Sequence, residues 1–76
     1  MWVYALRSKK VDRVYVGMAA DIEKRLAEHN SGRVFSTKGY MPWYVVYREE
    51  CEDREVARKR EKYWKSGCGK EFLKKI

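Results

Sequence analysis

Five side chains in this sequence have the types and the placement for proton transfer and anion binding. Tyr4 and Tyr15 are eleven residues apart, each at the centre of a short apolar run. Arg25 and His29 fall on or beside the stripe of a predicted helix that should face the interior, where an unpaired charge is costly. Glu61 lies at the border of the inward stripe of a second predicted helix, a stripe made of Val56, Ala57, Arg60, Tyr63 and Trp64.

Each of these residues also has an ordinary structural interpretation, and the pattern alone leaves both open. A tyrosine in a strand is most often a core residue with its hydroxyl at the surface. Arg25 can lay its stem along the edge of the apolar stripe with its head in water, beside a hydrogen-bonded core histidine. Glu61 can be the i,i+4 partner of Lys65 on a solvated helix face.

The elements that must position these side chains follow from periodicity and capping signals. Alternating strand formers predict strands over 2–7, 13–17 and 42–49. Helical periodicity behind capping aspartates predicts helices from about 21 to 30 and over 53–66, and a short last helix follows at 70–76. The expected order is β-β-α-β-α-α, an α+β fold with an antiparallel three-stranded sheet flanked by helices.

The first two strands can pair only as an antiparallel hairpin, because the connector between them is short. The two tyrosines would then lie opposite or diagonal to each other, and the register decides whether they share a face. Gly17 ends the second strand and indicates a backbone that bends or is closely approached.

Size and charge restrict the class of protein. The 76 residues make one domain, 1–76, and 18 basic against 11 acidic residues give a net charge of +7. Such a field favours an anionic partner, and nucleic acid comes before an anionic membrane surface. No apolar segment is long enough to span a bilayer, and the first residues carry their charges in the reverse order of a signal peptide. We therefore expect a soluble, cytoplasmic protein.

The cysteines indicate neither a zinc site nor a disulfide. Cys51 and Cys68 form no CxxC pair, and the single histidine is distant from both in the sequence. Two reduced thiols are the simpler interpretation.

The order of several short motifs resembles a known family. "WVY" (2–4) and "YVG" (15–17) are followed by "DIEKRLAEHNSG", "STKGYMPWYVVYRE" and "ARKREKYWKS". Each motif is weak alone, but their ordered set resembles a GIY-YIG nuclease domain of the compact single-domain kind, over nearly the whole chain. The resemblance implies a three-stranded antiparallel sheet flanked by helices and phosphodiester cleavage with a divalent metal.

The resemblance also implies roles for the five side chains. Tyr4 and Tyr15 match the tyrosines of the two motifs, and Arg25 matches the helix arginine that faces the scissile phosphate. His29 falls where the family places a histidine or tyrosine, and Glu61 matches the glutamate that binds the single metal. Three features depart from the pattern: Trp2 replaces the first glycine, Met18 stands where some members carry a lysine, and the asparagine that some members carry near the domain end has no counterpart.

From these roles we expect a metal-dependent endonuclease. Mg²⁺ or Mn²⁺ on Glu61 would act as a Lewis acid, and Arg25 would hold the phosphate. Tyr4 is our choice for the general base, assisted by Tyr15, although the reverse assignment stays open. His29 would orient a tyrosine or relay the proton. Nearby cations are expected to lower the pKa of the phenol that acts as base.

The substrate is expected to be DNA, cleaved with low intrinsic sequence specificity in repair or recombination. No small-molecule cofactor or membrane is implied, and the protein is expected to be a monomer, with a dimer as the alternative. Basic side chains outside the motifs are candidates for phosphate contacts, among them Lys38, Lys62 and Lys65.

Two other functions stay open at this point. One is a non-catalytic basic nucleic-acid-binding module on the same fold, in which exposed aromatic residues stack on bases and Glu61 is a salt-bridge partner. The other is a small basic structural protein in which Arg25 and His29 only stabilise the fold.

Overall fold

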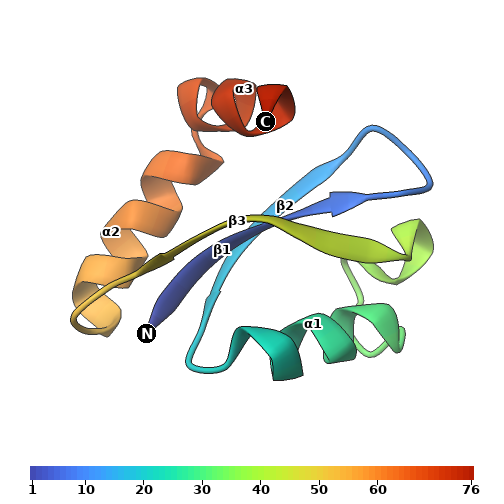
Figure 1. Cartoon of the computed structure of the whole chain (residues 1–76), viewed down its shortest axis with the longest axis horizontal. Coiled ribbons are helices and arrows are strands. Elements are labelled where there is room, and N and C mark those ends of the chain that lie inside the picture. The colour runs from blue at the N-terminus through green and yellow to red at the C-terminus, as the bar shows by residue number, and fades with distance from the viewer.

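The computed structural model describes all residues of the chain, 1–76, and has the predicted order of elements. Three strands and three α-helices follow one another as β-β-α-β-α-α, with one short 3₁₀ turn before the last strand (Figure 1). The elements are β1 Trp2–Ser8, β2 Val14–Ala19, α1 Ile22–Asn30, η1 Lys38–Tyr40, β3 Trp43–Glu50, α2 Arg54–Lys65 and α3 Gly67–Lys75. The predicted α+β class is confirmed.

The sheet is antiparallel throughout, with β1 in the centre and β2 and β3 at the edges. In the β1–β2 hairpin, Tyr4 is paired with Gly17 and Leu6 with Tyr15. Residues two apart on a strand share a face, so the two tyrosines lie diagonally on the same face of the sheet. The predicted pairing of the hairpin is therefore confirmed, and its register brings both phenols to one side.

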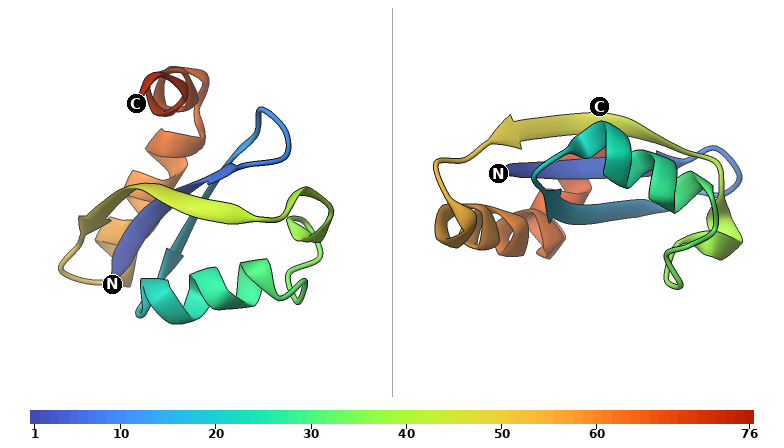
Figure 2. Two further views of the ribbon diagram at one scale, coloured as in Figure 1. Left: turned by 45° about the vertical axis from the view of Figure 1, so that its right-hand side comes forward. Right: turned by 90° about the horizontal axis from the view of Figure 1, so that it is seen from below.

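Helices cover both faces of the sheet, as Figures 1 and 2 show. On one face, Val3 and Ala5 of β1 pack with residues of α2 and α3 such as Ala57 and Leu73. On the other face, Tyr4 and Leu6 pack with Ile22 of α1 and with Trp43. Because successive side chains of β1 point to opposite faces of the sheet, one core is purely apolar and the other contains Tyr4, the tyrosine of the first motif.

Aspartate side chains cap the N-termini of α1 and α2. Asp21 caps α1 by accepting from the Lys24 backbone N–H at 3.1 Å, and Asp53 caps α2 by accepting from the Val56 N–H at 2.9 Å. Both predicted caps are confirmed. The fixed start of α1 matters for the site because that helix carries Arg25 and His29.

The predicted start of the last helix, residue 70, is wrong, because α3 begins three residues earlier. Ser66 both ends α2 and caps α3, accepting from the Gly69 N–H at 3.3 Å. A Cβ at Gly69 would lie 2.6 Å from the Trp64 Cα, so the two helices approach each other through this glycine. Glycine often ends a helix, but here Gly69 lies inside one and permits the close packing of two consecutive helices.

The predicted inward stripe of α2 is correct for Ala57 and Trp64 and wrong for two other members. Val56 and Tyr63 are 39% and 49% exposed. Arg60 turns towards the end of β3, where its guanidinium donates to the Glu49 carboxylate at 2.7 Å. This ion pair fixes the rotation of α2 so that Glu61, rather than Val56 or Tyr63, faces the body of the protein.

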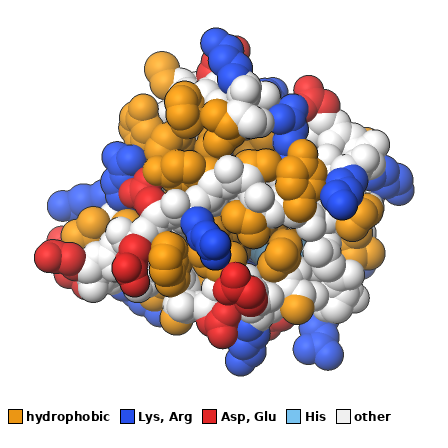
Figure 3. Space-filling model, viewed as in Figure 1, with side chains coloured by type: hydrophobic (Ala, Val, Ile, Leu, Met, Phe, Trp, Pro, Cys, Tyr) orange, Lys and Arg blue, Asp and Glu red, His pale blue; other side chains and the backbone are white.

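The surface reflects the composition. On the face of Figure 3, hydrophobic side chains gather between the sheet and the α2–α3 corner, while basic side chains surround the outline. No helix is long and apolar enough to cross a bilayer. Cys51 is buried and Cys68 exposed, and both are free.

Candidate active site

The candidate site is built around Tyr4, whose side chain crosses the edge strand β2. Its ring lies over Gly17, where a Cβ would come within 2.7 Å of the Tyr4 hydroxyl oxygen and 2.9 Å of the ring carbon that bears it. No side chain longer than hydrogen fits beneath the ring without displacing it. The glycine therefore lets a buried tyrosine of the central strand extend its hydroxyl over β2.

His29 forms a hydrogen bond with this hydroxyl. Its side chain is fully buried, with Nε2 at 3.0 Å from the Tyr4 hydroxyl and Nδ1 at 2.8 Å from the Thr37 hydroxyl. Thr37 donates its own proton to the Val34 carbonyl at 3.3 Å, so it accepts from His29 Nδ1–H. The neutral imidazole then carries no proton on Nε2, and Tyr4 O–H donates to it.

The pKa of His29 supports this neutral state. Burial lowers its pKa, and the nearby positive charge of Arg25 lowers it further against the opposing effect of Glu28. An imidazole that stays neutral at physiological pH can accept a proton from a phenol. The structure thus shows His29 as a buried, hydrogen-bonded residue, and this structural interpretation does not exclude a role in proton transfer.

Tyr15 and Arg25 complete the group. The Tyr15 ring lies 4.8 Å from the His29 ring and 6.4 Å from the Tyr4 ring, measured between centroids. Arg25 donates to the Glu28 carboxylate at 3.2 Å, and its side chain is 37% exposed. A hydrogen-bonding interaction with Tyr4 raises the pKa of Arg25, which places the guanidinium beside the phenol. The exposed part of the side chain leaves this cation accessible from solvent.

The expected lowering of the tyrosine pKa is wrong for Tyr4. Burial raises the pKa of Tyr4 to about 12, and the interaction with Arg25 only partly opposes this effect. The nearby cations are visible in the sequence, but the loss of water around the Tyr4 hydroxyl depends on the packing of the folded protein. Tyr4 is therefore a neutral phenol at physiological pH, and any proton that it accepts requires a place for its own proton.

Glu61 approaches this group from α2. Its negative charge is close enough to contribute to the raised pKa of Tyr4. The side chain is 21% exposed, and its Oε2 lies 3.5 Å from Lys65 Nζ, so the predicted i,i+4 pair is present. No group of three or more histidine, cysteine, aspartate or glutamate side chains could hold a metal ion anywhere in the chain.

A lone carboxylate can still suit one kind of metal. Mg²⁺ and Mn²⁺ bind oxygen ligands, and Mg²⁺ keeps several waters and takes one or two protein carboxylates together with substrate phosphates. Glu61 is partly exposed and close enough to Tyr4 to affect its pKa, so it has the donor chemistry for such a shared site. It is not suited to a metal that needs a closed protein cage.

Comparison with known proteins identifies the family. The family described as the GIY-YIG catalytic domain matches residues 1–74. The chain belongs to the GIY-YIG family. Its three-stranded sheet, with the two motif tyrosines on adjacent strands, is a nuclease-type fold, and membership of this nuclease family implies binding of nucleic acid.

The GIY-YIG chain is also similar to several bacterial UPF0213 proteins. A protein of Staphylococcus saprophyticus is 36% identical over 76 residues, covering 99% of this chain and 92% of its own length. One from Clostridium perfringens is 37% identical over 65 residues, 84% of this chain and 69% of its own length. One from Desulfotalea psychrophila is 42% identical over 50 residues, 63% of this chain but 46% of its own length. No solved structure matches.

The structure adds to the site one residue that the sequence did not indicate. Thr37 lies in a polar loop with no periodicity, and only its contact with His29 gives it a place in the site. Among the predicted phosphate contacts, Lys65 pairs with Glu61, Lys38 lies 5.0 Å over the exposed Phe35 ring, and Lys62 is exposed on α2. Lys62 and Lys65 lie three residues apart on α2, whereas Lys38 belongs to η1.

Proposed function

We propose that this GIY-YIG protein is a metal-dependent endonuclease that hydrolyses phosphodiester bonds in DNA with low sequence specificity. The surroundings of Tyr4 carry the proposal: its hydroxyl is hydrogen-bonded to a neutral histidine, a second phenol ring lies 6.4 Å away between centroids, and the charges of Arg25 and of Glu61 on another helix both act on its pKa. Hydrolysis of a phosphodiester needs the same functions, namely a proton acceptor, a cation for the phosphoryl oxygens and a ligand for a metal.

The proton path follows from the hydrogen bonds. As an attacking water gives its proton to the Tyr4 oxygen, Tyr4 gives its own proton to His29 Nε2, which Thr37 keeps free of hydrogen. The phenol therefore never has to exist as a free phenolate, which its pKa of about 12 would make rare at neutral pH. Tyr15 lies beside both rings and positions the water or, in the reverse assignment, receives its proton first.

Two further side chains act on the phosphate. Arg25, held in orientation by Glu28, binds the non-bridging oxygens as a permanent cation. Glu61 would hold Mg²⁺ or Mn²⁺, which when bound supplies Lewis-acid stabilisation of charge on the phosphate and the leaving oxygen. We further propose that the protein acts as a cytoplasmic monomer in DNA repair or recombination.

The experiment is a cleavage assay on labelled single-stranded, duplex and branched DNA and on single-stranded RNA. Each substrate is incubated with Mg²⁺, Mn²⁺ or a chelator. We compare the wild type with Glu61→Gln and with Glu55→Gln, a matched change of an exposed glutamate on the same helix.

Cleavage that requires metal, survives Glu55→Gln and falls at least about 100-fold in Glu61→Gln would support the proposal. Preferred cleavage of RNA would correct the substrate. Binding of all substrates without cleavage would instead identify a non-catalytic nucleic-acid-binding module.

A further inference from the structure

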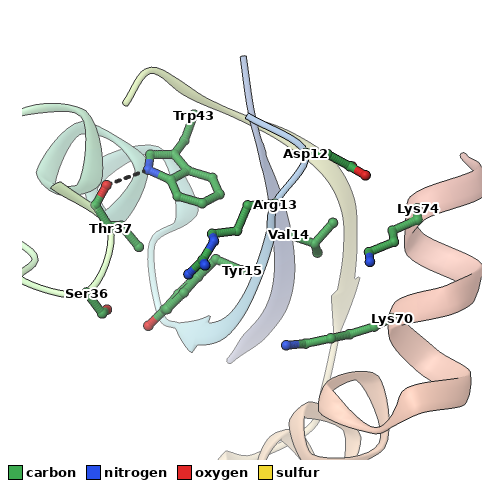
Figure 4. Close-up of a pocket in the computed structure, with 9 residues that line it drawn as sticks. All are labelled: Asp12, Arg13, Val14, Tyr15, Ser36, Thr37, Trp43, Lys70 and Lys74. Atoms are coloured by element: carbon green, nitrogen blue, oxygen red, sulfur yellow. Dashed lines mark hydrogen bonds between the residues drawn. The ribbon is translucent and has the colours of Figure 1, made fainter. Parts of the chain in front are cut away.

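A pocket lies directly beside the candidate active site, along the free edge of β2. Its volume is about 480 Å³, within the usual range for sites that bind small molecules. Figure 4 shows that β2 forms its floor, α3 one wall and the loop before η1 the other. We name it the β2–α3 pocket; its lining includes Arg13, Val14, Tyr15, Thr37, Lys70 and Lys74.

The pocket shares two residues with the site. Tyr15 contacts the His29 ring and Thr37 holds His29 Nδ1, and both also line the pocket. A nucleic-acid strand with one phosphate beside Arg25 and the tyrosines would therefore place its neighbouring nucleotide in this pocket.

The charge of the pocket is positive and not neutralised by the protein. Arg13, Lys70 and Lys74 extend towards the space from opposite sides. None of the three takes part in any of the ion pairs of the structure, and the one acid of the lining, Asp12, pairs with Arg7 at 3.5 Å. Three unpaired cations around one concavity make a favourable place for an anion.

The arrangement of these cations is also built into the fold. The Arg13 guanidinium stacks on the Tyr40 ring at 4.3 Å from its centroid, which fixes one side of the opening. Lys70 and Lys74 are one helical turn apart and therefore point to the same side of α3. Val14 and Tyr15 offer apolar surface between these charges, as a sugar ring would require.

We propose that the β2–α3 pocket binds the phosphate and sugar next to the scissile bond on the cleaved strand. This subsite deepens the proposed function and rests on it. Arg13, Lys70 and Lys74 contact the neighbouring phosphate, and Tyr15 lies between the two nucleotides. The subsite holds the strand in register while Arg25 binds the phosphate of the bond that is cut.

The first test measures binding without cleavage. The affinity of a labelled single-stranded oligonucleotide is measured by fluorescence anisotropy in chelator at several salt concentrations. Lys70→Ala/Lys74→Ala is compared with Lys24→Ala/Arg54→Ala, which removes the same charge from exposed positions outside the pocket. Circular dichroism checks that both variants are folded.

We expect the pocket variant to bind about 10-fold more weakly, with a log–log salt slope smaller by about 0.7 to 1 per lost phosphate contact, and the control variant within about 2-fold of the wild type. Equal losses in the two variants would overturn the proposal, because a diffuse positive field would then explain them. Unchanged binding in the pocket variant would overturn it as well.

The second test locates the contact on the substrate. Single phosphates on either side of the cleaved bond are replaced by neutral methylphosphonates, and single-turnover cleavage is measured. One neighbouring replacement should slow the wild type about 10-fold at subsaturating protein but scarcely affect Lys70→Ala/Lys74→Ala. Equal losses in both proteins would contradict a contact between this pocket and that phosphate.

The two tests separate this inference from the proposed function. If the wild type cleaves DNA but the pocket variant binds and cleaves like it, only the subsite is wrong. If the wild type binds without cleaving, the endonuclease proposal fails, while the anisotropy comparison still decides whether the pocket holds a nucleic-acid phosphate.

Discussion

The geometry around the Tyr4 hydroxyl depends on a residue with no side chain. Because the Tyr4 ring rests on Gly17, a methyl group there would have to displace the ring or bend β2. The nearest atoms belong to a packed aromatic ring that cannot move aside easily. The second motif therefore contributes a glycine whose function is to give space to the tyrosine of the first.

At this position we predict that Gly17→Ala lowers cleavage at least about 10-fold while leaving DNA binding within about 2-fold, since small misplacements of a catalytic group are costly. Gly39→Ala is the control, because a Cβ there would meet nothing within 4 Å. Single-turnover rates and anisotropy measure the two effects. Full activity in Gly17→Ala would show that the position of Tyr4 is not critical.

Thr37 determines which nitrogen of His29 carries the proton. In Thr37→Val the Nδ1–H loses its acceptor, so the tautomer with a proton on Nε2 becomes competitive and cannot accept from Tyr4. We predict about 10-fold lower kcat with little change in KM, and a loss of about 1–3 kcal/mol in the free energy of unfolding. Thr37→Ser, which keeps an acceptor, should restore kcat. Equal kcat in Thr37→Val and the wild type would remove the tautomer from the mechanism.

At the scale of elements, capping signals and apolar alternation predicted most of the fold. Asp21 and Asp53 could be identified in the sequence because a side-chain cap acts within one helical turn. The start of α3 and the rotation of α2 could not, because they depend on contacts between elements. The α2–α3 junction needs the close approach at Gly69, and the rotation of α2 needs Glu49 from β3 to hold Arg60.

The α2–α3 junction yields a prediction about stability. A Cβ at Gly69 would lie 2.6 Å from the Tyr63 carbonyl oxygen and from the Trp64 Cα, both backbone atoms that cannot yield cheaply. Gly69→Ala should lower the free energy of unfolding by about 2 kcal/mol or more. Gly67→Ala, where a Cβ meets nothing within 4 Å, should be neutral or slightly stabilising. Urea unfolding of both variants measures the difference, and equal stability would mean that the junction is looser than described.

At the scale of the whole molecule, the sequence indicated which side chains lie near one another but not their pKa values. The ordered motifs placed the tyrosines, Arg25, His29 and Glu61 in one site, and the register of the sheet is consistent with that grouping. The pKa of Tyr4 was predicted in the wrong direction because burial is a property of the packed molecule. Thr37 was missed for the same reason, since its loop carries no periodic pattern.

Burial of His29 makes stability depend on pH. The folded state lowers the pKa of His29 below its ordinary value of 6.5. The contribution of the neutral, buried imidazole to the free energy of unfolding is therefore fully present above pH 6.5 and is lost as the pH falls. The pKa of Glu49 is also lowered, mainly by hydrogen bonds from Arg60, but its contribution is lost only below about 4.5.

We therefore predict that the free energy of unfolding falls between pH 6.5 and 4.5, by at most about 1.4 kcal/mol per pH unit. The slope should disappear in His29→Gln even if that variant is less stable overall. Urea unfolding at each pH measures it. An identical slope in wild type and variant would show that another group titrates in this range.

The most direct test of the account is the single-turnover rate of metal-dependent DNA cleavage by Tyr4→Phe. Tyr44→Phe is the control, because Tyr44 is an exposed tyrosine on β3 outside the site. We predict that Tyr4→Phe binds DNA like the wild type but cleaves it at least about 100-fold more slowly, while Tyr44→Phe keeps the wild-type rate. Cleavage by Tyr4→Phe at the wild-type rate would contradict a mechanism centred on this hydroxyl.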